Sequence, residues 1–182
     1  MYYTDISLNV DDYYNPVNYI ITDLFIKLYP VNGFSYYQAG ITNLGNRDNL
    51  PKNEKDYRAK PNQIDARIGL YNDWADLSVG MIRGAGGLVA EVKPLYQSKY
   101  FAIKNLGIYG EATDFGRNRY INGRLFEKPY YSLGAKTWIT KNIGVGVRYN
   151  DIAEASSFQA TTSISFEDKE LASVLGLATL AK

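Results

Sequence analysis

Apolar and polar side chains alternate along most of this chain, and the charged ones fall almost entirely on one parity. Period-two alternation rich in β-branched and aromatic residues is typical of strands with two unlike faces. The pattern predicts about ten strands. They lie near residues 3–10, 19–29, 34–42, 63–71, 74–83, 88–95, 104–113, 130–139, 143–149 and 157–166. Tight turns such as Asn72-Asp73 and Lys141-Asn142 separate them, so neighbouring strands are expected to pair antiparallel.

The two parities carry different chemistry. The apolar row includes Ile68, Val79, Ile108, Leu133, Val145 and Ile164. The opposite row holds the charged residues Asp65, Arg67, Asp76, Glu91, Lys93, Glu111, Lys136 and Arg148, with Gly69, Gly80, Gly107, Gly134, Gly144 and Gly146 among them. One face of the sheet is therefore nearly free of charge, and the other carries nearly all of it.

Alternation alone does not say which face lies inside. In a soluble β-sandwich or lipocalin-like barrel the apolar row forms the core, whereas in an outer-membrane barrel it faces lipid and the charged row lines the lumen. Three features favour the membrane barrel. Glycines concentrate on the charged parity, where a narrow lumen needs small residues. Short and long links fall largely on opposite ends of the strands. The last strand ends in Ile164 and Phe166, which resembles the signal read by bacterial outer-membrane assembly machinery, with Thr161 where that signal usually has glycine.

Composition restricts the chemistry further. The 182 residues contain no cysteine and no histidine, which removes disulfides, thiolate metal ligands and the usual general base. We expect no enzymatic activity, no cofactor and no metal, and the net charge of +1 gives no reason to expect nucleic acid as a partner. No apolar run is long enough for a spanning helix.

The expected organisation is a barrel domain over 1–166 and an amphipathic helical tail over 167–182.

Several local patterns have more than one interpretation. The charges of the polar row could contact a lipid headgroup, although mutual neutralisation inside a closed lumen is the simpler expectation. The run from Arg83 to Gly87 reads as a hairpin turn and not as a phosphate-binding loop, because no helix pattern follows it. Tyrosines near strand ends on the apolar parity suit an interfacial girdle, namely Tyr29, Tyr37, Tyr131 and Tyr149. Trp74 and Trp138 fall on the polar parity and do not add to it.

From Ala66 onward the chain also resembles a known family. The stretches that carry the resemblance are Gly80–Gly87, Ala112–Gly116, Gly146–Asp151 and Ser165–Leu171. They are similar to the C-terminal β-barrel attached to some MCE (mammalian cell entry) proteins, the MlaD-like lipid-transport components of diderm bacteria. Arg83 stands where an acidic residue is expected, so the resemblance implies no particular ion pair there.

The resemblance implies a barrel in the bacterial outer membrane that anchors an MCE-type trans-envelope bridge for phospholipid trafficking. Its implied partners are phospholipids, the outer-membrane assembly machinery, an upstream MCE domain and inner-membrane transporter subunits. The alternatives are a soluble barrel or sandwich that binds an apolar ligand, and a free-standing small outer-membrane barrel. In the membrane interpretation, charged side chains crowd the lumen and make it a poor pore for anything larger than ions or water.

Overall fold

A computed structural model describes residues 2–10, 19–30, 33–44, 62–121, 124–154 and 156–167. Its strands are β1 (Tyr2–Val10), β2 (Tyr19–Leu28), β3 (Ser35–Thr42), β4 (Gln63–Tyr71), β5 (Ala75–Ile82), β6 (Ala85–Val92), β7 (Gly107–Thr113), β8 (Arg119–Ile121), β9 (Arg124–Phe126), β10 (Tyr130–Trp138), β11 (Ile143–Asn150) and β12 (Ser157–Phe166). One short helix, α1 (Phe101–Lys104), lies between β6 and β7.

Ten of the strands form a closed antiparallel barrel in the order β1-β12-β11-β10-β7-β6-β5-β4-β3-β2. Barrel strands pair with their neighbours along the chain, except that β7 pairs with β10 across the inserted β8–β9 hairpin. The barrel closes where β1 pairs with β12, from Tyr2 opposite Phe166 to Val10 opposite Phe158. Closure gives every strand of the barrel a partner on both sides, although the part of β2 from Tyr19 to Asp23 lies beyond its pairing with β3. The remaining two strands, β8 and β9, form a separate hairpin.

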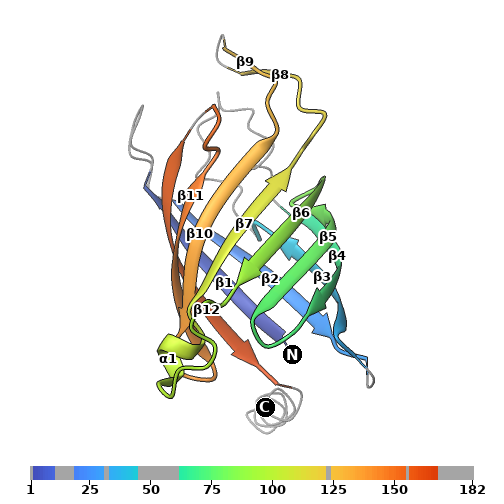
Figure 1. The fold of residues 1–182 in the computed structure, drawn as a ribbon. Coiled ribbons are helices and arrows are strands. Elements are labelled where there is room, and N and C mark those ends of the chain that lie inside the picture. Colours follow the sequence, from blue (N-terminus) through green and yellow to red (C-terminus); the bar gives the residue numbers. More distant parts are fainter. Residues whose placement is uncertain are drawn as a thin grey trace, which may run out of the picture.

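The two ends of the barrel differ. One end carries the β2–β3, β4–β5 and β10–β11 turns together with α1, and β1 begins and β12 ends there (Figure 1). The opposite end carries the long β3–β4 link and the projecting β8–β9 hairpin (Figure 1). We call the first the turn end and the second the loop end. The β5–β6 turn is the exception, because it is tight but lies at the loop end: Arg83 and Gly84 both adopt positive φ, 49° and 76°.

The barrel is polar inside and apolar outside. On β4, Asp65 is 1% exposed while its neighbour Ile64 is 60% exposed, and Val79 at the middle of β5 is 63% exposed. Among the described residues, the buried apolar or aromatic side chains are Phe25, Tyr36, Ile82, Phe126 and Tyr130, whereas the most deeply buried side chains are polar ones such as Asp23 and Asp65. The charged parity of the sequence therefore points into the barrel and the apolar parity points away from it.

Glycines on the inner face make room for large neighbours. A Cβ atom at Gly134 of β10 would overlap the Tyr109 ring of β7, and a Cβ atom at Gly69 of β4 would overlap the Tyr36 ring of β3. Because these aromatic rings lie flat over glycine backbone, the interior fits bulky and small residues side by side, as a narrow barrel requires.

The sequence prediction of an all-β antiparallel barrel is confirmed, and its ten segments correspond to the ten barrel strands. Three details differ. Strand β6 begins at Ala85 and not at residue 88, because the turn is confined to Arg83 and Gly84. The helix α1 and the β8–β9 hairpin were not predicted, since both are too short to show a period. The predicted helical tail beyond Glu167 lies outside the described residues.

Candidate functional site

Ion pairs cross the barrel interior. They are Arg83 with Asp23 (Nη2–Oδ2 2.7 Å), Arg67 with Asp65 (Nε–Oδ1 2.7 Å), Lys136 with Glu91 (Nζ–Oε2 2.7 Å), Arg148 with Glu111 (Nη2–Oε2 2.9 Å) and Lys27 with Asp76 (Nζ–Oδ2 3.9 Å). Except for Arg67 with Asp65, each joins elements that are not adjacent in the barrel wall. Lys136 with Glu91 and Arg148 with Glu111 each bridge one intervening strand on the inner face, whereas Arg83 with Asp23 and Lys27 with Asp76 bridge two.

The turn-end part of this network is centred on Asp76 of β5. The Tyr36 hydroxyl of β3 donates a hydrogen bond to Asp76 Oδ1 at 2.6 Å. The Lys27 ammonium group lies 4.3 Å from the centroid of the Tyr36 ring, where a cation and an aromatic face attract each other. Tyr29 and Tyr71 complete an aromatic cluster around Tyr36, with ring centroids 5.9 and 6.1 Å from it. This end of the interior is thus closed by aromatic rings that an ion pair holds in place.

The middle of the interior holds buried polar atoms that have no protein partner among the described residues. They are Glu111 Oε1, Ser132 Oγ, Arg148 Nε and Gln159 Nε2. Glu111 and Ser132 face each other on β7 and β10, and Arg148 faces Gln159 on β11 and β12. Buried polar atoms of this kind are normally satisfied by ordered water.

A second ionic cluster lies at the loop end. The Arg117 guanidinium group donates to both carboxylate oxygens of Asp151 at 3.1 Å, and its Nη1 lies 3.5 Å from Glu154 Oε2. It also stacks 4.7 Å from the centroid of Phe126 in β9. Arg117 follows β7 and Asp151 follows β11, so this bidentate pair ties two loop-end links together. Strand parity does not indicate this ion pair, because Arg117 and Asp151 lie in links where no period of two applies.

The predicted charged residues are placed as follows. Asp65, Glu111 and Arg148 are buried in the interior, and Arg67, Asp76, Glu91, Lys93 and Lys136 are partly buried. All of them except Lys93 belong to the ion pairs described above. Lys93 instead follows β6 at the turn end. Three members of the network were not in that predicted set, Asp23, Lys27 and Arg83, although the parity rule also places Asp23 and Lys27 on the polar row.

The predicted outward-facing residues form part of an apolar outer belt. Ile68, Val79, Ile108, Leu133 and Val145 are exposed on the outside of the barrel, and Ile164 is partly exposed. Exposed aromatic rings lie at both ends of this belt: Phe34, Tyr37 and Trp74 at the turn end, and Phe115, Tyr131, Tyr149 and Phe158 at the loop end. Trp74 joins this set because it lies in the β4–β5 turn, where strand parity no longer decides its direction. Tyr29, which was predicted for the same girdle, instead packs against Tyr36 in the interior cluster. Aliphatic residues occupy the zone between the two aromatic rows.

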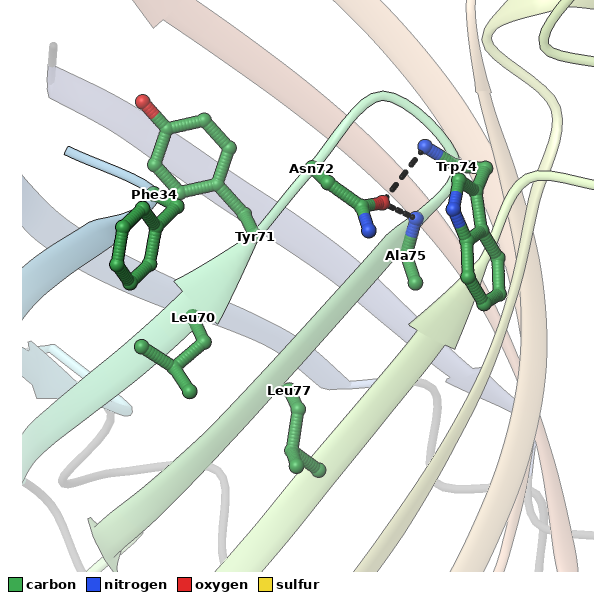
Figure 2. Close-up of a pocket in the computed structure, with 7 residues that line it drawn as sticks. All are labelled: Phe34, Leu70, Tyr71, Asn72, Trp74, Ala75 and Leu77. Atoms are coloured by element: carbon green, nitrogen blue, oxygen red, sulfur yellow. Dashed lines mark hydrogen bonds between the residues drawn. The ribbon is translucent and has the colours of Figure 1, made fainter.

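A shallow apolar groove of about 380 Å³ opens on the outer belt at the turn end (Figure 2). Phe34, Leu70, Trp74 and Leu77 line it. Asn72 shapes its rim, since its side-chain oxygen accepts hydrogen bonds from the backbone N–H groups of Trp74 at 3.0 Å and Ala75 at 2.7 Å.

Burial and the nearby Asp76 carboxylate raise the pKa of Tyr29 to about 12, so its hydroxyl stays protonated at neutral pH.

The described residues bring together no group of three or more acidic, cysteine or histidine side chains that could hold a metal ion. Within the same residues, no helix is long and apolar enough to cross a membrane. The main chemical features of the barrel are therefore its ion-paired interior and its apolar exterior.

Comparison with known families corrects one expectation. A family model described as a lipocalin-like domain matches residues 5–173. No curated protein matches the chain. The resemblance to the barrel of MCE and MlaD-like proteins was therefore wrong, and with it fall the trans-envelope bridge, the phospholipid-trafficking role and the MCE and inner-membrane partners inferred from it. The motifs that suggested it, such as Gly80–Gly87 and Gly146–Asp151, are strand ends and turns that a closed antiparallel barrel needs for its own geometry.

Proposed function

The chain belongs to the family of lipocalin-like domains, whose model covers nearly all of its barrel, and we propose that this barrel works embedded in a lipid bilayer. The observation that carries the proposal is the reversed polarity of the wall. Charged residues such as Asp23 and Asp65 are 1% exposed, whereas apolar residues such as Val79 are 63% exposed. A barrel in water would gain free energy from the opposite arrangement.

The outer belt suits lipid. Monomeric proteins in water rarely expose apolar patches larger than a few hundred Å², yet here apolar side chains face outward on described strands around the barrel. Aromatic residues at both ends of the belt are typical of the two membrane interfaces. The barrel strands are 7 to 10 residues long, close to the roughly 9 to 11 that a tilted spanning strand needs. Closure also pairs the backbone groups of the wall with one another, as the hydrocarbon region requires.

The interior indicates a scaffold more than an open pore. Ion pairs occupy the lumen, among them Arg83 with Asp23 and Lys136 with Glu91. Burying a charged group without a partner costs free energy. Breaking one of these ion pairs to let a solute pass would therefore leave the remaining charge uncompensated. We therefore propose a non-enzymatic role in which the barrel is held by membrane lipids, its direct partners. The bacterial outer membrane is the proposed location, with the local assembly machinery recognising the last strand.

The family match favours a second candidate, a soluble lipocalin-like barrel that binds an apolar ligand. With charges inside, such a ligand would have to lie against the outer belt, for example in the groove between Phe34 and Trp74. The two candidates differ in what covers the outer belt: a continuous layer of lipid in the first, one bound molecule and water in the second.

One experiment separates them. The full chain is purified with and without detergent and run unboiled and boiled on an SDS gel, and binding of the fluorescent fatty acid cis-parinaric acid is measured in parallel. A membrane barrel requires detergent or lipid to stay monodisperse and migrates differently after boiling. A chain that is monodisperse without detergent, shows no heat-dependent shift and binds the fatty acid with one-to-one stoichiometry contradicts the membrane proposal and supports the second candidate.

A further inference from the structure

The link between β6 and β7 combines exposed apolar rings with positive charge. It runs from Lys93 to Leu106 at the turn end and contains α1. Lys93, Lys99 and Lys104 are its charged residues, and it contains no acidic one. Tyr100 is 73% exposed, and the helix α1 buries none of its side chains. A turn that served only to connect two strands would have no need to display these groups together.

The link is held firmly against the barrel wall. The Thr137 hydroxyl of β10 donates a hydrogen bond to the backbone carbonyl of Ala102. Asn105 donates through its side-chain amide to the Phe101 carbonyl at 2.9 Å, which closes the end of the helix. Because Ala102 faces the wall, Phe101 and Ile103 on either side of it remain exposed, 48% and 43%. The link lies at the turn end of the barrel (Figure 1), where α1 contacts β10 and both Lys99 and Lys104 are exposed.

We propose that this link is a binding surface for anionic phospholipid headgroups, with Lys93, Lys99 and Lys104 contacting the phosphates and Tyr100, Phe101 and Ile103 lying among the first acyl carbons. The proposal rests on the proposed membrane function and adds a lipid class to it. Charge complementarity identifies the occupant: the link carries three lysines and no acidic residue of its own, and of these lysines Lys93 lies near the Glu91 carboxylate of β6. Lysines and aromatic rings together are typical of segments that lie in a membrane interface, where the lysines attract anions. A zwitterionic headgroup offers these lysines no net charge.

The absence of cysteine allows a site-specific test. Gln97→Cys places a single thiol on an exposed position of the link, to which a fluorescent donor is attached. The full-length labelled chain is reconstituted in vesicles of phosphatidylcholine and phosphatidylglycerol in equal amounts, and energy transfer is measured to acyl-labelled phosphatidylglycerol or acyl-labelled phosphatidylcholine present as a tracer. The ratio of the two transfer efficiencies reports enrichment of the anionic lipid beside the link.

We expect a ratio above one that falls toward one at high salt, because salt screens exposed charges. Lys99→Gln should lower the enrichment by up to about fivefold, the factor that one cation near an anionic surface contributes. The triple change of Lys93, Lys99 and Lys104 to Gln should abolish it. Lys128→Gln, an equally exposed lysine at the loop end, is the matched control and should leave the ratio unchanged.

The outcomes separate the two proposals. If the chain does not insert into either kind of vesicle and shows no heat-dependent gel shift, the membrane function itself fails. If it inserts normally but the ratio is one, or if Lys128→Gln lowers the ratio as much as Lys99→Gln does, the headgroup site is overturned while the membrane function stands.

Discussion

Arg83 of the β5–β6 turn reaches across the barrel to Asp23 of β2, where its Nη2 lies 2.7 Å from the carboxylate Oδ2. The other carboxylate oxygen accepts a hydrogen bond from the backbone N–H of Asn43 at 2.8 Å. Strands β2 and β5 are separated in the wall by β3 and β4, so this pair spans the lumen at the loop end. One arginine thus neutralises a buried carboxylate and also closes the interior.

Replacing Arg83 should be costly. Arg83→Leu leaves the Asp23 carboxylate, 1% exposed, without its counter-charge, and we expect a loss of about 3 to 5 kcal/mol in the free energy of unfolding. The measurement is urea unfolding in detergent micelles. The double variant Arg83→Leu with Asp23→Asn should recover much of the loss, because no buried charge then remains. Equal destabilisation in the single and double variants would show that the arginine acts through packing and not through the pair.

Charge placed on the outer belt should block insertion in a depth-dependent way. Val79 lies at the middle of β5 opposite Ile68 and Leu88, so Val79→Arg is expected to cost about 2 to 4 kcal/mol in a bilayer. Ile64 is similarly exposed but near the loop end of β4, and Ile64→Arg should cost about 0 to 1 kcal/mol. Folding into phosphatidylcholine vesicles, followed by the gel shift, measures both. If the two variants fold equally well, the outer belt does not face lipid.

Glycines of the inner face should tolerate substitution less well than those elsewhere. Gly134→Ala places a methyl group within the Tyr109 ring position, and overpacking of this kind costs about 1 to 3 kcal/mol. Gly86→Ala is the matched control in β6, since no atom lies within 4 Å of the added Cβ. Thermal unfolding in micelles, read by far-UV circular dichroism, should separate the two. A Gly134→Ala barrel as stable as the Gly86→Ala barrel would mean that Tyr109 moves aside without cost.

The wall of this barrel could be predicted from parity, but its interior contacts could not. Alternation placed Asp65 and Arg67 on one face and Ile64 and Ile68 on the other, because a strand fixes side-chain direction with a period of two. Which acid meets which base depends on the stagger of the strands around the closed wall, and that stagger is not encoded locally. The pairs of Arg83 with Asp23 and of Arg117 with Asp151 join residues far apart in the sequence for this reason. The predicted MCE family was wrong because it depended on strand-end motifs, and unrelated barrels share such motifs.

The loop-end cluster yields a local prediction. Arg117→Met removes the bidentate partner of Asp151, whose side chain is fully buried, and frees the link after β7 from the link after β11. Most of the barrel wall is untouched by this change, so we expect faster proteolysis within residues 114–129 while the heat-dependent gel shift is retained. Limited digestion of the folded chain with chymotrypsin, which still finds Phe115 and Phe126 in the variant, measures the rate, and Lys128→Gln serves as a control that alters charge in the same link without touching the pair. Unchanged cleavage would mean that Phe126 and Glu154 hold the loop end without the Arg117 pair. Loss of the gel shift together with faster cleavage would instead place the pair among the contacts on which the whole barrel depends.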